Sequence, residues 1–180
     1  MTHFGDRLTE VNRRTATPLC MGIDPHISMI PTIFGSVQDG AASDAAIRAV
    51  NDFSMACLEQ AIGNVAAIKP QAAFFEQQGP AGMQILQNLG RAAIDAGLLV
   101  IMDAKRGDIG STSTAYAAGW IGHDAPFPSD ALTVNPWLGI DTLVPFIDRA
   151  DATGSGLFIL NRTSNPGAVS YTHLTLPTKA

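Results

Sequence analysis

Short apolar runs alternate with longer stretches of helical periodicity along most of the chain. The apolar runs are bounded by polar or glycine-rich turns, which is typical of buried strands. Between them, apolar residues recur at three- and four-residue spacing, which predicts helices with one buried face. The predicted strands lie at 18–23, 65–68, 98–102, 131–134 and 156–160, and the predicted helices at 1–16, 43–62, 81–96, 111–122 and 141–150.

This alternation of strands and helices predicts a parallel sheet with the helices outside it. A doubly wound sheet and a β/α barrel share the same element order. Polar residues follow every predicted strand rather than one reversal point, and this favours a barrel of the TIM type. A complete barrel has eight strands, whereas this sequence predicts five. We therefore expect an incomplete α/β barrel, formed by about the first five β/α units.

Composition and charge exclude several classes of function. Hydrophobic residues make up 46% of the 180 residues, and 11 basic and 16 acidic residues give a net charge of -5. No basic face is evident, so we expect no nucleic-acid partner. No apolar run is long enough to span a membrane. The charged residues Asp6, Arg7 and Glu10 stand where a signal peptide is apolar, so we expect a cytoplasmic protein.

Cysteines and glycine motifs add little further chemistry. Cys20 falls in a predicted strand and Cys57 in a predicted helix, and both fit small buried hydrophobic residues in a reducing compartment. No metal-ligand spacing, dinucleotide-binding glycine motif or P-loop is present.

Charged residues follow the third predicted strand abruptly, in the stretch Leu98–Tyr116. Asp103 and Lys105 are two positions apart, so they point to the same side of an extended chain. At the carboxyl end of a parallel strand, that side faces the mouth of an active site. The alternative is a solvated turn in which Asp108 caps the next helix. We favour a catalytic cluster, because a second lysine ends another apolar strand.

That second lysine is Lys69, which stands at the end of the second strand and before a proline. The alternative to a catalytic role for Lys69 is a structural one, in which its aliphatic stem covers the edge of the core. Asp24 follows the first strand in the sequence Asp-Pro-His. The sequence favours neither of two roles for Asp24, a turn-forming residue or an acceptor for a substrate hydroxyl. His26 fits a loop residue better than a ligand.

The segment 103–109, DAKRGDI, resembles the D-x-K-x-x-D-I motif of the orotidine 5′-phosphate decarboxylase family. Lys69 matches the other lysine of the family's Lys-Asp-Lys-Asp tetrad. Segments 67–76, 134–139 and 162–167 resemble the longer bacterial subfamily, and the resemblance runs from about residue 4 to residue 167. The D-x-K-x-x-D turn alone is shared with related sugar-phosphate enzymes, but these blocks in this order are specific.

The resemblance implies a lyase without cofactor or metal that converts orotidine 5′-phosphate to UMP and carbon dioxide, the last step of de novo pyrimidine nucleotide synthesis. It implies that Asp103 faces the departing carboxylate and that Lys105 delivers a proton to C6. Lys69 would hold the charge array and one ribose hydroxyl, and Asp24 another ribose hydroxyl.

The resemblance also implies a homodimer. Asp108 and Thr112 would come from the partner subunit across the interface, with Ile109 beside them. Ser164 would contact the pyrimidine ring.

The last residues, 169–180, do not continue the family pattern, and neither a helix nor a sixth strand fits them. We interpret them as a non-native tail after a partial decarboxylase domain at 1–168. In the family the phosphate is held by late strands, through a loop and an arginine that this sequence lacks. We therefore expect the 180-residue chain by itself to be inactive and aggregation-prone.

Two other functions remain as alternatives. One is a magnesium-dependent sugar-phosphate decarboxylase or aldolase of the same superfamily, such as a ketogulonate-phosphate decarboxylase or a hexulose-phosphate synthase. The blocks Asn135-Pro136-Trp137 and 163–167 argue against it. The other is an inactive fragment that serves only as an interaction module, for which the sequence offers no binding surface.

Overall fold

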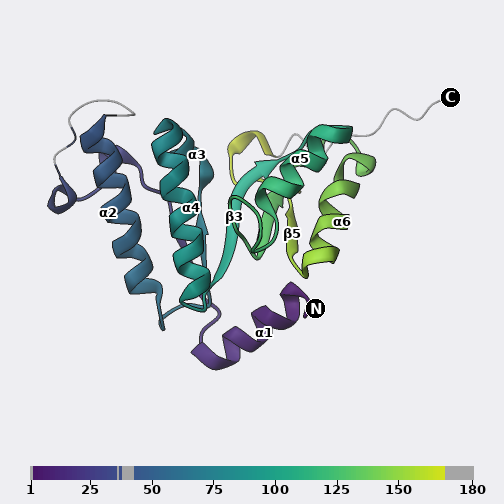
Figure 1. The fold of residues 1–180 in the computed structure, drawn as a ribbon, viewed down its shortest axis with the longest axis horizontal. Coiled ribbons are helices and arrows are strands. Elements are labelled where there is room, and N and C mark those ends of the chain that lie inside the picture. The colour runs from purple at the N-terminus through teal and green to yellow at the C-terminus, as the bar shows by residue number, and fades with distance from the viewer. Residues whose placement is uncertain (1, 36, 38–42, 169–180) are drawn as a thin grey trace.

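The computed structural model describes residues 2–35, 37 and 43–168 (Figure 1). Within these residues, five strands form one parallel sheet. The strands are β1 (Cys20–Ile23), β2 (Ala67–Pro70), β3 (Leu99–Arg106), β4 (Ala131–Val134) and β5 (Gly156–Ile159).

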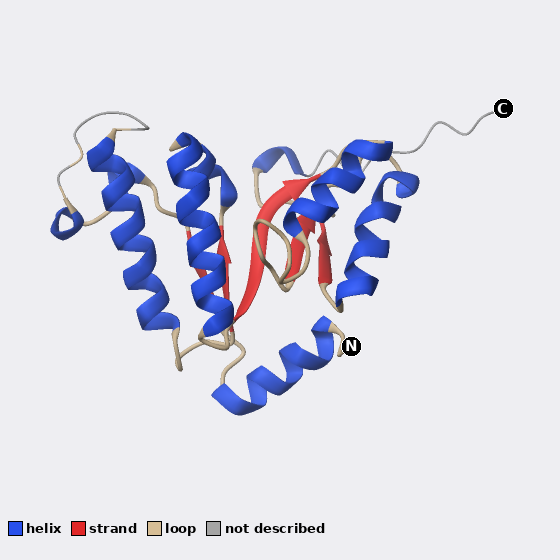
Figure 2. Ribbon diagram, in the orientation of Figure 1, coloured by secondary structure: helices blue, strands red, loops and turns tan. Residues whose placement is uncertain are grey.

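Each strand pairs with the next strand of the chain, in the spatial order β1-β2-β3-β4-β5. A doubly wound sheet instead reverses its order at a switch point. The sequential order is that of a barrel wall, so the prediction of an incomplete β/α barrel is confirmed. Figure 2 shows the sheet behind the helices that connect its strands.

The α-helices of the described residues are α1 (Phe4–Thr15), α2 (Asp44–Ala61), α3 (Ala72–Glu76), α4 (Gly79–Asp95), α5 (Gly110–Trp120) and α6 (Val144–Thr153). Short 3₁₀ helices lie at Ile27–Met29, Thr32–Phe34, Ile140–Leu143 and Pro166–Ala168. The sequence offers Ser43 or Asp44 as the cap of α2, and the cap is Ser43, whose side chain accepts a hydrogen bond from the Ala46 N–H at 3.1 Å.

The two faces of the sheet have different partners. Alternate strand residues, among them Ile68, Val100 and Leu132, pack in the main core against the outer helices. The residues between them face the other way, which we call the inner face. At the start of the strands the inner face is apolar and is covered by Phe4 and Val11 of α1. In Figure 1, α1 lies across that end of the sheet.

The inner face changes character along the strands. The apolar residues packed against α1 are Ala67, Leu99, Ile101 and Ala131. Two residues after Ala67, Ile101 and Ala131, and on the same face, are Lys69, Asp103 and Thr133. The inner face therefore has an apolar end that α1 covers and a polar end at the carboxyl termini of the strands.

Several sequence-based expectations about local structure are wrong. β3 continues to Arg106 and does not end at Met102, because its charged residues lie on the polar end of the inner face. Residues 72–76 form α3, where no helix was predicted, and α4 begins at Gly79. Pro80 fits the first turn of α4 because that turn needs no N–H from it.

The predicted burial of Cys20 is also wrong, because Cys20 is exposed. Cys57 is half-buried and packs against the main core. Cys20 lies on β1, which is an edge of the sheet and pairs only with β2 in the described residues, and Ile23 is the one buried residue of β1. The predicted tail at 169–180 lies outside the described residues. No described helix has both the length and the apolar character needed to cross a membrane.

Candidate active site

Three of the charged residues predicted from the sequence, Lys69, Asp103 and Lys105, meet on the inner face at the carboxyl ends of β2 and β3. Lys69 Nζ lies 2.8 Å from Asp103 Oδ2, and Lys105 Nζ lies 2.5 Å from Asp103 Oδ1. The Asp103 side chain is 9% exposed, whereas those of Lys69 and Lys105 are 35% and 44% exposed. The structure thus confirms the predicted side-by-side placement, with one buried carboxylate between two accessible ammonium groups.

These contacts set the charge state of the cluster. Burial by itself raises the pKa of Asp103, but hydrogen bonds from Lys105, Lys69 and Thr133 outweigh it, and the pKa lies below its ordinary value. Burial lowers the pKa of Lys69, but contact with Asp103 and the nearby Asp24 charge outweigh it, and the pKa is raised. Asp103 and Lys69 are therefore both ionised at neutral pH.

Two further residues contact the carboxylate and were not predicted. The Gln71 amide donates to Asp103 Oδ2 at 3.2 Å, and the Thr133 hydroxyl donates to Asp103 Oδ1 at 3.0 Å. Gln71 follows Lys69 by two residues, so strand alternation could have placed it on the same side. Thr133 stands out as the polar residue of the strand Ala131-Leu132-Thr133-Val134.

Asp24 lies near this cluster but makes no hydrogen bond to it in the described residues. Its carbonyl accepts the His26 N–H at 2.8 Å, which is the turn that the Asp-Pro sequence predicted. Its charge contributes to the raised pKa of Lys69, because β1 pairs with β2 at this end of the sheet. Both interpretations of Asp24 are thus compatible with its position.

Asp108, Ile109 and Thr112 lie apart from the cluster. Asp108 Oδ1 accepts the Ile109 N–H at 2.7 Å, just before α5. Within the described part of the chain, Asp108 makes no ion pair with Lys69 or Lys105. Ile109 is 63% exposed, and Thr112 is also exposed. One copy of the chain does not bring these residues to the array.

Ser164 is an exposed residue of the segment that follows β5. A cavity of about 260 Å³ lies next to it, lined by Lys105 and by residues that follow β4 and β5: Asn135, Trp137, Leu160, Asn161, Thr163 and Asn165. Lys105, whose side chain is 44% exposed, therefore borders both the charge cluster and this cavity.

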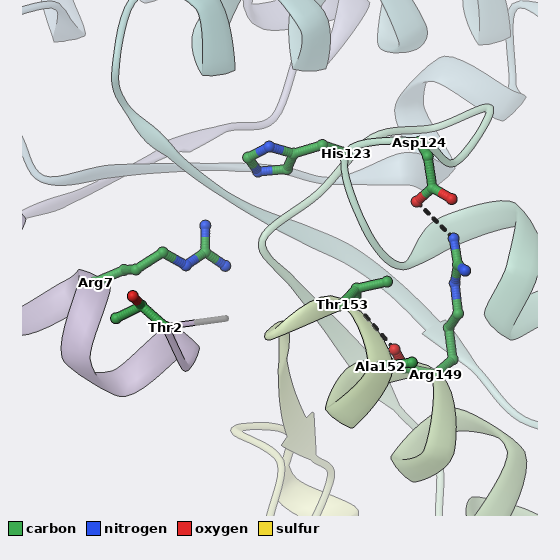
Figure 3. Close-up of a pocket in the computed structure, with 7 residues that line it drawn as sticks. All are labelled: Thr2, Arg7, His123, Asp124, Arg149, Ala152 and Thr153. Atoms are coloured by element: carbon green, nitrogen blue, oxygen red, sulfur yellow. Dashed lines mark hydrogen bonds and ion pairs between the residues drawn. The ribbon is translucent and has the colours of Figure 1, made fainter.

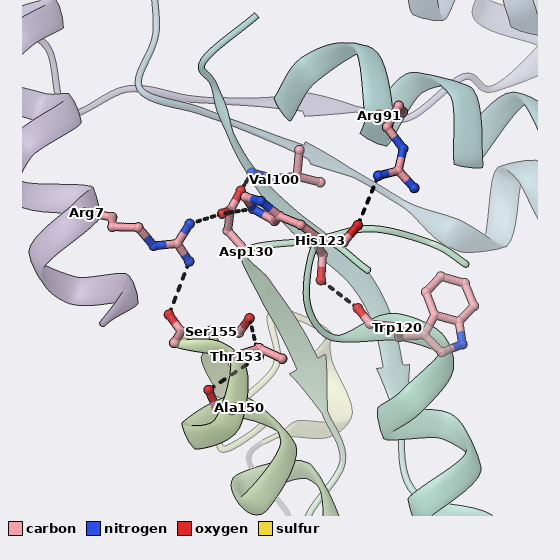
Figure 4. A network of polar contacts seen from close by, with 11 residues as sticks. Arg7, Arg91, Val100, Trp120, His123, Asp130, Ala150, Thr153 and Ser155 are labelled. Atoms are coloured by element: carbon pink, nitrogen blue, oxygen red, sulfur yellow. Dashed lines mark hydrogen bonds and ion pairs between the residues drawn. The ribbon is translucent and has the colours of Figure 1, made fainter. Parts of the chain in front are cut away.

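A cavity of about 550 Å³ lies elsewhere, near the amino-terminal end of the strands (Figure 3). Its Arg149 contacts Asp124 at 2.6 Å, and its Arg7 contacts Asp130. Asp130 is buried and also holds the Val100 N–H at 2.7 Å and His123 at 2.7 Å (Figure 4). Because both arginines are paired, we interpret this region as the attachment of α1 to the sheet.

The charge cluster has the groups needed for proton transfer and charge stabilisation. An ammonium fixed beside a carboxylate can stabilise negative charge that develops on a bound molecule, and it can then donate a proton. The buried carboxylate holds both ammonium groups on the inner face.

Comparison with known proteins identifies the family of this chain. A sequence model described as "Orotidine 5'-phosphate decarboxylase / HUMPS family" matches residues 17–178. Orotidine 5′-phosphate decarboxylase of Streptomyces coelicolor is 44% identical over 173 residues, covering 96% of this chain and 59% of that protein. That of Rhodopirellula baltica is 42% identical over 171 residues, covering 93% of this chain and 57% of that protein.

Solved structures give the same result. A Streptomyces avermitilis protein described as an orotidine 5′-phosphate decarboxylase superposes with a TM-score of 0.84 at 42% identity, covering 94% of this chain and 56% of that one. The OMP decarboxylase of Leishmania donovani gives 0.74 at 31% identity, covering 99% and 61%. The chain spans 57% of the length of the Rhodopirellula baltica relative and 59% of the length of the Streptomyces coelicolor relative. It belongs to the orotidine 5′-phosphate decarboxylase / HUMPS family.

Proposed function

We propose that a protein containing this chain decarboxylates orotidine 5′-phosphate to UMP and carbon dioxide. The observation that carries the proposal is the buried Asp103 carboxylate, held between Lys69 at 2.8 Å and Lys105 at 2.5 Å. The names of the curated relatives support the same reaction.

The chemistry of this reaction requires a fixed positive charge. Loss of carbon dioxide leaves an electron pair at C6 that the ring π-system does not accept. The Lys105 ammonium stabilises that negative charge and then supplies the proton that forms UMP. Because Asp103 already holds this ammonium, little reorganisation accompanies the reaction.

The remaining roles in the proposed site follow the family pattern. Asp103 faces the substrate carboxylate, and Lys69 binds one ribose hydroxyl while it holds Asp103 in place. Asp24 accepts a hydrogen bond from the other ribose hydroxyl, and Ser164 contacts the pyrimidine ring. The exposure of Asp24 and Ser164 leaves both residues accessible to a substrate.

We also propose that the site is completed in a homodimer. The partner subunit contributes Asp108 and Thr112, with Ile109 beside them. Exposed apolar side chains near α5 and after β4 support an interface there: Ile109 at 63%, Trp137 at 52%, Leu138 at 58% and Ile140 at 74% exposed.

The activity test uses two forms of the protein. One is the 180-residue chain. The other, which we call the extended chain, continues residue 168 with the carboxyl-terminal segment of the Streptomyces coelicolor relative. Each is offered orotidine 5′-phosphate or a sugar phosphate, and product formation is followed. We expect the extended chain to form UMP; turnover of a sugar phosphate alone would reject the proposal.

The dimer is tested by mixing two inactive variants of the extended chain, Lys105→Ala and Asp108→Ala. If each site combines Lys105 of one subunit with Asp108 of the other, mixed dimers contain one intact site. Activity should then return to about a quarter of the unmodified value after subunit exchange. A mixture that stays inactive although mixed dimers form would contradict the shared site.

The division after residue 168, the cytoplasmic location and the independence from cofactors and metals stay predictions. The family match extends to residue 178, beyond the proposed boundary. Recovery of the reading frame around the codon for Ala168 tests the boundary directly.

A further inference from the structure

β3 contains an irregularity beside the charged cluster. Met102 pairs with Leu132 and Arg106 pairs with Val134, so four residues of advance along β3 match two residues of advance along β4. Residues 103–105 therefore all lie opposite Thr133. A bulge of this kind takes backbone groups away from their regular ladder partners, and those groups need other hydrogen bonds.

Lys105 has a φ of 48°, in the left-handed region that non-glycine residues seldom adopt. Such a conformation persists where the surrounding contacts fix it. At the next residue of the chain, the Arg106 carbonyl accepts the Asn135 N–H at 2.8 Å. The Arg106 guanidinium lies 4.6 Å from the centre of the Trp120 ring. At Lys105 itself, the backbone N–H donates to Thr133 Oγ1 at 2.9 Å.

The directions of the Thr133 hydrogen bonds follow from chemistry alone. A backbone N–H can only donate, so Thr133 Oγ1 accepts from Lys105. An ionised carboxylate can only accept, so the Thr133 proton goes to Asp103 Oδ1 at 3.0 Å. That same oxygen accepts the Lys105 ammonium at 2.5 Å. One hydroxyl thus holds both the backbone and the carboxylate partner of the lysine.

We propose that Thr133 is a positioning residue, whose hydroxyl fixes the Lys105 backbone and the Asp103 carboxylate together and so places the Lys105 ammonium. The inference rests on the proposed decarboxylation. Thr133 acts through Lys105 and Asp103, and not on the reacting atoms. Lysine has a long flexible side chain, so two fixed points narrow the region that its ammonium can occupy.

The experiment compares Thr133→Val, which removes the hydroxyl at nearly constant shape, with Thr133→Ser, which keeps it. Thr142→Val is the matched control, because the buried Thr142 hydroxyl donates to the Gly139 carbonyl at 2.6 Å, away from Asp103. Two quantities are measured in the extended chain: the Asp103 carboxyl pKa by NMR titration, and kcat and KM for orotidine 5′-phosphate.

For Thr133→Val we expect the Asp103 pKa to rise by about half a unit to one unit. We expect kcat to fall about tenfold or more with KM little changed, because the proton donor is displaced. Thr133→Ser and Thr142→Val should match the unmodified protein in both measurements. If Thr133→Val does not fold, Thr133→Ala measured beside Thr133→Ser gives the same contrast.

Two results would overturn the inference. One is an unmoved Asp103 pKa with unchanged kcat in Thr133→Val, and the other is a Thr133→Ser variant as impaired as Thr133→Val. Failure of the proposed function looks different: no form of the protein would make UMP, while the Asp103 pKa would still respond to Thr133→Val.

Discussion

Asp103 and Lys105 share one strand, and their charged ends meet at 2.5 Å on its inner face. Strand alternation brings the two side chains to the same side, and the bulge of β3 turns the lysine backbone so that its ammonium reaches back to the carboxylate. The contact is therefore built into the backbone of β3.

The cluster should make stability depend on pH at both extremes. The pKa of Asp103 is lowered by folding. Its contribution is therefore complete above the ordinary carboxyl value of about 3.9 and is lost as pH falls through the folded pKa. The pKa of Lys69 is raised. Its contribution is complete below about 10.4 and is lost as pH rises through the folded pKa.

Urea unfolding measured across pH checks this dependence. In the Asp103→Asn variant, the free energy of unfolding should change less with pH, in the acid window and in the alkaline window. Asp151→Asn, which changes an exposed carboxylate of α6, should leave the pH dependence unaltered. Equal acid sensitivity of the Asp103→Asn variant and the unmodified protein would contradict the coupling.

The Arg7–Asp130 ion pair should fasten α1 to the sheet. Asp130 is 1% exposed, so Arg7→Met leaves a buried carboxylate whose one remaining side-chain partner among the described residues is His123. We expect a loss of about 3 kcal/mol in the free energy of unfolding, read from urea titration. Arg13→Met, on an exposed position of the same helix, is the control and should change little. An Arg7→Met variant as stable as the control would show that the attachment of α1 to the sheet does not depend on this ion pair.

Gly156 should be required for the packing of Phe4 on β5. A Cβ at this position would lie 2.6 Å from the Phe4 ring. Gly156→Ala should therefore lower stability by about 1–3 kcal/mol, through displacement of Phe4. Gly119→Ala is a suitable control, because a Cβ there meets nothing within 4 Å and Gly119 lies within α5. That control should be neutral or stabilising, and thermal melts of both variants are compared.

Chelation of divalent metals should leave decarboxylation by the extended chain unchanged, because the proposed chemistry uses side-chain ammonium groups. Assays with EDTA, and with magnesium added back, distinguish this mechanism from the metal-dependent sugar-phosphate enzymes of the superfamily. Activity that disappears with EDTA and returns with magnesium would favour those enzymes.

The sequence predicts the elements and the centre of the site because both depend on local pattern. Apolar runs mark the strands, and the abrupt charges at Lys69 and Asp103 mark the carboxyl end of the sheet. The role of Thr133 is different, because it depends on the register between β3 and β4 and on a bulge. Register is set by packing between distant segments, which no local pattern contains.

The exposure of Cys20 was missed for a related reason. An apolar run predicts burial, but burial of both faces requires neighbours on both sides, and β1 is an edge of the described sheet. In the proposed homodimer, the placement of Asp108 at the site depends on a second copy of the chain, which the pattern of one chain does not specify.

The most direct test of the proposed mechanism is UMP formation from orotidine 5′-phosphate by the extended chain, with and without Lys105→Ala. The unmodified protein should form UMP, and Lys105→Ala should reduce turnover by about 1000-fold or more while the protein stays folded. Near-normal turnover of the Lys105→Ala variant would contradict the assignment of Lys105 as the proton donor.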